Sequence, residues 1–414
     1  MSSRFRQNKA MALSIAIPVS RRKRSFLDLF SFWALILLSG QGLLNYLLGQ
    51  SALSPWKQLL LMVCFLTALL RIQRPFDFYV SIYVLASSCA LIVSGSVEGV
   101  GMDTLLFNSF YYVAWLPFYL TGTVFDLRGR SNFVRHASLL FLLIGAIGLV
   151  LQLYTPFFDF LKDQEAADIR SRAGETQRFG FIFVTSTLVM PTLAGMYFLY
   201  LRTAKNMFSR AVAQASLVLA VLPTGSLAGL IMLLSTFGMI VPRLRVASAV
   251  PFLVGLALLA AAAAPFSDDL IDRQLQRMTG NTIETASNQT RLGLWQYAVD
   301  TIANFPIEMQ VFGAGLGVTN SNRAQTATYA HGESSFFQAL IEGGLVGLTL
   351  RILPFFLLLS ANLPRKDSMT NWAYGLGLFI CCAAAPLFGG FGLQCLLGFN
   401  AGLSQQIARR AGDR

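Results

Sequence analysis

The stretch that decides the fold runs from Arg291 to Gly347 and joins a polar loop to an apolar helix. It contains R-L-G-L-W at Arg291–Trp295, G-A-G-L-G at Gly313–Gly317, H-G-E at His331–Glu333 and E-G-G-L-V-G at Glu342–Gly347. After Glu333 the chain stays apolar for long enough to cross a bilayer, which takes roughly 20 residues. An arginine, a histidine and two glutamates beside such a helix indicate chemistry at a membrane surface.

The composition of the chain is that of a membrane protein. Apolar residues make up 55% of the 414 residues and charged residues 13%, whereas a soluble domain averages about 25% charged residues. The cysteines all fall inside apolar runs, which indicates small core residues and not disulfides or a zinc site. No cofactor is expected.

The expected fold is an all-α polytopic integral membrane protein with about 12 transmembrane helices and a large helical periplasmic loop. Successive apolar runs predict the spans. They are 26–48, 54–70, 76–95, 104–124, 137–156, 179–201, 211–222, 225–241, 247–265, 335–360, 371–388 and 391–405.

The placement of charge predicts which side each loop faces. The formal net charge is +12, and most Lys and Arg residues fall on one side of the predicted spans. The positive-inside rule makes that side cytoplasmic, with both termini on it. The charge therefore reflects topology, and nucleic-acid binding is not expected.

This topology divides the chain into five parts. They are a cytoplasmic basic tail at 1–25, transmembrane helices over 26–265 with a periplasmic loop at 157–178, a large periplasmic loop at 266–333 that carries the motifs, the remaining transmembrane helices over 334–405, and a cytoplasmic tail at 406–414.

The pair of spans 211–222 and 225–241 is unusually short. Twelve residues of helix cover about 18 Å, less than the roughly 30 Å hydrocarbon core. Either both helices are stunted around Pro223–Gly225, or they form a re-entrant hairpin. Both arrangements leave a depression on the outer face, because irregular backbone at membrane depth must line a cavity or be buried in protein.

The large loop is predicted to contain a helix that starts near Thr290 and ends at Pro306. Leu292, Trp295, Val299 and Ile302 are expected to share one face of it. Arg291 then stands at the helix start, which suits an anion held between the guanidinium and the helix N-terminus. A solvated arginine stacked on Trp295 explains the position equally well.

His331 is the first candidate for catalysis. An imidazole with a pKa near its ordinary value of roughly 6.5 can accept a proton at physiological pH. A lone histidine more often only caps a helix, but here Glu333 and Glu342 can orient it or tune its charge. Glu342 falls in or just above an apolar helix, where ionisable residues are functional by default, and no partner for it can be assigned from the sequence.

Other outer-side residues are weaker candidates. Arg172 and Arg178 precede a span, where arginines often only meet lipid headgroups, although Arg178 is well placed to reach a phosphate. Gly313–Gly317 lacks the strand–turn–helix setting of a dinucleotide site. A third group is acidic and is explained more simply by helix capping than by a divalent ion: Asp268, Asp269 and Asp272. A metal-independent site is therefore expected.

The motifs together resemble the O-antigen ligase and O-antigen polymerase superfamily of bacterial envelope enzymes. The resemblance rests on R-L-x-x-W from Arg291, N-F-P-x(5)-F-G-A-G-L-G from Asn304, H-G-E-x(8)-E-G-G-x-x-G from His331, and R-A-G-E at Arg172–Glu175. It implies a metal-independent, inverting glycosyltransferase in the bacterial inner membrane. That enzyme would take a glycan from an undecaprenyl pyrophosphate carrier on the periplasmic face.

The resemblance also implies roles for single residues. His331 would activate the acceptor hydroxyl and Arg291 would hold the pyrophosphate, with Trp295 and Ser226 as candidate substrate contacts. The chain departs from the family at Gly332, where Asn is common, and at Leu227, where an arginine often follows the turn serine. Arg178 or Arg172 can replace that missing phosphate contact.

Several functions fit this pattern. H-G-E in place of the H-N common in ligases favours a polymerase of O-antigen or exopolysaccharide, acting on a lipid-linked glycan and a second glycan. A ligase that transfers glycan to a lipid A-core acceptor is the alternative. A transporter of a lipid-linked sugar or anionic solute is disfavoured by the long loop and the lack of half-chain symmetry. An assembly scaffold would tolerate the loss of His331.

Overall fold

The computed structural model describes residues 21–42, 55–72, 74–154, 183, 186–204, 206–224, 226–243, 283–319, 334–385, 387 and 390–412, and all regular secondary structure in these ranges is helical. The expected all-α fold is thereby confirmed. The predicted loop at 157–178 and the predicted span 247–265 lie outside the described residues. The division of the chain into five parts stays a prediction.

Each of the remaining predicted spans overlaps at least one described helix. The elements are α2 (Arg21–Ser39), α4 (Pro55–Leu69), α5 (Pro75–Val97), α6 (Met102–Val113), α7 (Trp115–Val124), α8 (Leu127–Tyr154), α10 (Ser186–Thr203), α11 (Met207–Thr224), α12 (Leu227–Ile240), η3 (Val241–Arg243), α14 (Ile283–Ala303), α15 (Ile307–Phe312), α16 (Ser335–Leu359), α17 (Arg365–Ala384) and α18 (Phe391–Gly412). Among them, α5, α8 and α16 are long and apolar enough to cross a membrane. The chain is a helical membrane protein, and the number of its crossings stays a prediction.

Among the described helices, α7 and α18 pack against each other most extensively. Gly398 and Gly402 are four residues apart on α18, and a methyl group at either would clash with the carbonyl oxygen of Trp115 or Tyr119 on α7. Glycines at this spacing let two helix backbones approach closely where there is no water to drive association. This G-x-x-x-G pair therefore fixes the centre of the bundle.

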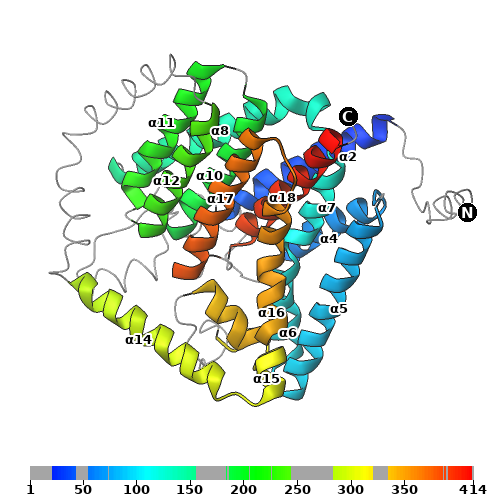
Figure 1. The fold of residues 1–414 in the computed structure, drawn as a ribbon, viewed down its shortest axis with the longest axis vertical. Helices are drawn as coiled ribbons and strands as arrows, with labels where there is room; N and C mark the ends of the chain where they lie inside the picture. The colour runs from blue at the N-terminus through cyan, green and yellow to red at the C-terminus, as the bar shows by residue number, and fades with distance from the viewer. Residues whose placement is uncertain are drawn as a thin grey trace, which may run out of the picture.

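One end of the molecule collects the helix ends predicted to be cytoplasmic, and we call it the inner end. Arg71 at the end of α4 forms an ion pair with Asp28 in α2 (2.6 Å), and Asp28 also accepts from the backbone N–H of Asp126 (3.3 Å). Arg409 of α18 donates to the carbonyl of Thr123 of α7 (3.3 Å). Figure 1 shows the start of α2 and the end of α18 together at this end.

A second set of contacts at the inner end, here the inner polar cluster, joins α10, η3, α17 and α18. Arg202 donates to Asn371 Oδ1 (2.6 Å) and to Ser404 Oγ (3.0 Å). Arg243 pairs with Asp367 (2.5 Å). Each side chain reaches across the end of a regular helix, so this cluster fastens helix ends without disturbing their backbones.

The predicted length of the 211–222 helix is wrong, although its apolar part and that of α12 are still shorter than the helices able to cross a membrane, and the choice between two short helices and a re-entrant hairpin stays open. α11 runs over 18 residues, Met207–Thr224, which corresponds to about 27 Å. The helix begins four residues before the apolar run, because Ser209 and Arg210, which interrupt that run, belong to its first turn. α12 is short, with 14 residues.

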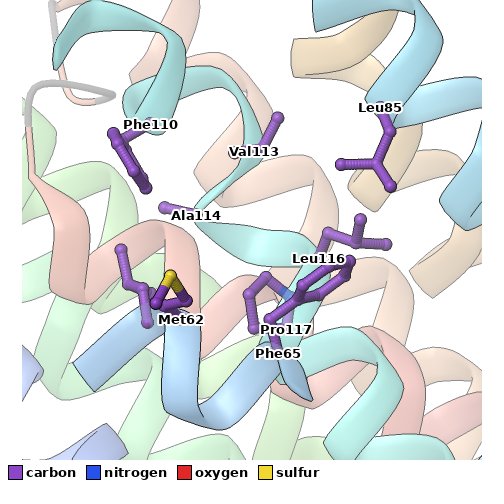
Figure 2. A pocket seen from close by; sticks show the side chains of 9 residues that line it. Met62, Phe65, Leu85, Phe110, Val113, Ala114, Leu116 and Pro117 are labelled. Atoms are coloured by element: carbon purple, nitrogen blue, oxygen red, sulfur yellow. The ribbon is translucent and has the colours of Figure 1, made fainter. Parts of the chain in front are cut away.

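The predicted span 104–124 is two helices and not one. The break falls at Ala114, between α6 and α7. Pro117 has no N–H to donate to the carbonyl of Val113, so the helix cannot continue regularly through this point. The break leaves a cavity of about 140 Å³ that is lined only by apolar side chains of α4, α5 and the α6–α7 junction (Figure 2).

Candidate functional site

The candidate site is built around a kink in α16 at the E-G-G motif. Gly344 adopts φ 56° and ψ −151° inside the helix. A side chain at this position would come within 2.5 Å of the Val311 carbonyl group. Only glycine takes this conformation without steric cost, so the second glycine of E-G-G lets α16 turn against α15 (Figure 1).

The G-A-G-L-G loop packs its backbone against this kink. The N–H of Ala314 donates to the carbonyl of Ile341 (2.8 Å), and the N–H of Gly315 donates to that of Glu342 (3.1 Å). In a continuous helix those carbonyls would accept from residues four positions later. Glycines 313, 315 and 317 have φ of 77°, 111° and 90°. The two glycine motifs are thus one packing unit.

Glu342 lies at the centre of this unit and is buried, with 2% of its surface exposed. Its Oε2 accepts from the hydroxyl of Tyr112 on α6 (3.1 Å). Its Oε1 accepts from Thr319 Oγ1 (2.5 Å) and from Gln338 Nε2 (3.3 Å). Three donors from three segments satisfy the carboxylate away from solvent, as a buried charge requires.

Arg351 completes the group. Its guanidinium lies 4.0 Å from the centre of the Tyr112 ring, and its Nη1 donates to the carbonyl of Tyr111 (2.6 Å). Glu342 and Arg351 are nine positions apart and would face opposite sides of a straight helix. Tyr112 bridges them instead. We call Tyr112, Thr319, Gln338, Glu342 and Arg351 the outer polar cluster.

Sequence reasoning missed Tyr112 and Thr319. Tyr112 lies 230 residues from Glu342 in the chain, and a tyrosine in an apolar span carries no local signal of such a partner. Thr319 stands in a polar stretch like many threonines. The one available signal was Glu342, a glutamate in an apolar helix that needed hydrogen-bond donors, and the sequence did not indicate which residues would donate.

Arg291 does not stand at a helix start, and that prediction is wrong. α14 begins at Ile283, so Arg291 lies in its interior. The polar residues before Thr290 continue the helix, although they are typical of a cap. A contribution of the helix N-terminus to anion binding by Arg291 is therefore excluded.

Trp295 packs α14 onto α16. Its ring centre lies 6.2 Å from that of Phe337, and Ala298 below it is fully buried in a small apolar cluster with Ile341. Leu292 and Val299, predicted on the same face, are 63% and 51% exposed. The small side chain at Ala298 allows the close approach, so the contact face runs through Trp295, Ala298 and Ile302.

Ser226 caps α12. Its Oγ accepts from the N–H of Gly229 (3.4 Å), and the side chain is buried. α12 packs against α17, and the carbonyl of Ala385 just after α17 accepts from Ser335 Oγ (2.9 Å) at the start of α16. Ser226 therefore lies at the end of the bundle where α16 begins, which we call the outer end, and no described contact joins it to Glu342.

The remaining predicted site residues lie outside the described part of the chain: His331, Glu333, Arg172 and Arg178. The predicted start of an apolar helix after Glu333 is confirmed, because Ser334 caps α16 by accepting from the N–H of Phe336 (3.3 Å). Within the described ranges, no group of three His, Cys, Asp or Glu side chains could hold a metal ion. Asp268, Asp269 and Asp272 are not among the described residues.

Comparison with known proteins addresses the central part of the chain. No curated protein matches it by sequence. Residues 211–352 match the family model described as O-Antigen ligase. This stretch extends from α11 to Arg351 and includes Ser226, Arg291, His331 and Glu342. Over this stretch the chain is similar to the O-antigen ligase family.

Proposed function

We propose that the protein is a polysaccharide polymerase that joins lipid-linked glycans at the periplasmic face of the bacterial inner membrane. The observation that carries this proposal is the family match over 211–352, which spans every motif of the sequence resemblance except R-A-G-E. The donor is a glycan on undecaprenyl pyrophosphate, and the acceptor is a second lipid-linked glycan. The polymer is an O-antigen or an exopolysaccharide.

His331 is the general base of the proposed reaction. The acceptor hydroxyl attacks the anomeric carbon of the donor, the bond from that carbon to the pyrophosphate oxygen breaks, and the configuration inverts. His331 takes the hydroxyl proton, and Glu333 orients the imidazole. Such a base contributes about 10²- to 10⁴-fold to the rate.

Arginines stabilise the leaving pyrophosphate in this proposal. Arg291, within α14, holds the pyrophosphate, and Arg172 and Arg178 supply the contact that the family places at the position of Leu227. A guanidinium can bind a phosphate with two parallel hydrogen bonds, which a lysine cannot reproduce. No metal and no cofactor take part. Trp295 and Ser226 are proposed substrate contacts at the outer end.

Assay of purified protein with lipid-linked repeat units, with and without a lipid A-core acceptor, tests the reaction. Growth of longer lipid-linked chains is the expected result, unchanged by a chelator. Transfer to lipid A-core alone would overturn the polymerase in favour of the second candidate, a ligase, which the name of the matching family model favours. Loss of activity with the chelator would contradict the metal-independent mechanism.

A further inference from the structure

We propose that Tyr112 and Arg351 are positioning residues that act through Glu342 to hold both flanks of the segment carrying His331 and Glu333. The inference rests on the proposed function for its effect on catalysis. Glu342 itself, predicted from the sequence as catalytic, is on this account a positioning residue too.

One carboxylate oxygen joins the two flanks of that segment. Thr319 is the last described residue before it, and Gln338 lies one turn into α16 after it. Both donate to Oε1 of Glu342, at 2.5 and 3.3 Å. Fixing both flanks of a segment to one atom reduces the arrangements open to it, and we expect this to keep His331 and Glu333 closer to the productive geometry.

The other carboxylate oxygen fixes Glu342 to the bundle. Oε2 accepts from Tyr112 at 3.1 Å, and the side chain is almost wholly shielded from water. A carboxylate with three donors and no solvent access does not approach an acceptor sugar. Glu342 instead connects Tyr112 on α6 to Thr319 and Gln338 through hydrogen bonds.

Arg351 fixes the orientation of Tyr112 and balances the buried charge. Its guanidinium stacks on the Tyr112 ring at 4.0 Å while it also bonds to the Tyr111 carbonyl. A cation on the face of the ring and an anion at its hydroxyl hold one orientation of the tyrosine. The pair is electrically neutral, which lowers the cost of burying either charge.

Tyr112→Phe is the central variant, because it removes one hydroxyl and keeps the ring that Arg351 needs. We expect kcat to fall about tenfold or more with KM little changed, since a lost hydrogen bond to a charged group changes geometry and not substrate contact. Tyr83→Phe is the matched control. The hydroxyl of Tyr83, on α5, is hydrogen-bonded to that of Thr349 (2.8 Å). Thr349 lies on α16, as Glu342 does, but outside the outer polar cluster, so Tyr83→Phe should keep wild-type kcat.

Two substitutions at Thr319 separate the effect of its hydroxyl from that of its shape. Thr319→Val removes the donor at constant shape and should lower kcat as Tyr112→Phe does, whereas Thr319→Ser keeps the hydroxyl and should retain activity. In the double variant Tyr112→Phe/Thr319→Val the losses should be less than additive, because both act through one carboxylate. Full additivity, or equal kcat for the valine and serine variants, would overturn the proposal.

Hydrogen exchange gives a readout that does not depend on the reaction. The amides of Ala314 and Gly315, bonded to the α16 carbonyls, should exchange faster in Tyr112→Phe than in Tyr83→Phe. Unchanged exchange together with unchanged kcat would refute the positioning role. If the wild type forms no glycosidic bond but the exchange difference appears, the positioning role of Tyr112 is supported and only the proposed reaction fails.

Discussion

The two ends of the molecule bury arginine in different ways. In the inner polar cluster, Arg202 and Arg243 reach side chains at the ends of regular helices. In the outer polar cluster, the contacts depend on a kinked helix and on three loop glycines at positive φ. Of these two clusters, only the outer one is built on a kinked helix and on loop backbone at positive φ. Departures from regular structure that the surroundings must stabilise concentrate at functional sites, so the comparison assigns stability to the inner end and positioning to the outer end.

Removing one histidine from each end should give the largest contrast. His331→Ala should lower turnover by about 10²- to 10⁴-fold with the fold intact, because it removes the proposed base. His136, the only other histidine, is exposed beside Arg135 at the inner end, and His136→Ala should keep full activity. Steady-state rates on purified proteins measure both, and equal rates for the two variants would break the comparison.

The same chemical change in each cluster should give a smaller contrast. Glu342→Gln keeps the size of the side chain but weakens three hydrogen bonds, so kcat should fall about 10- to 100-fold. Asp367→Asn should cost about 1 kcal/mol of stability or less, because its side chain is 32% exposed. Its kcat per folded molecule should not change. A loss of kcat in Asp367→Asn as large as that in Glu342→Gln would show that the two ends do not differ in role.

Two glycines sharpen the comparison at the level of the backbone. Gly344→Ala should destabilise the protein by about 1–3 kcal/mol through its positive φ alone, and by more through its clash with Val311. Gly293→Ala lies in helix α14 with open space around it, and should be neutral or stabilise slightly. Apparent melting temperatures in one detergent give the ranking, and a stable Gly344→Ala protein would mean that the kink is dispensable.

Local pattern predicted the elements but not their long-range partners. The start of α16 followed from a polar loop that meets an apolar run, and the inner end followed from arginine placement. The start of α14 was missed because Asn288–Thr290 resemble a cap, and the break at Ala114 was missed because one proline does not lower the hydrophobicity of a span.

The candidate site was only partly predictable for the same reason. Glu342 was singled out because a charge in an apolar helix is costly. Its partner Tyr112 could not be found, since nothing local links two residues on different helices. The structural role of the glycine motifs could not be predicted either, because Gly313 meets the backbone of Glu342 and Gly344 meets that of Val311 only in the folded chain.

The most direct test of the central claim uses the protein in vesicles with lipid-linked repeat units supplied at the outer end. The account predicts that new glycosidic bonds form there, with inverted configuration and longer lipid-linked chains, and that His331→Ala slows their formation about 10²- to 10⁴-fold while His136→Ala does not. Movement of the glycan across the bilayer without any new bond would contradict it and would identify a transporter.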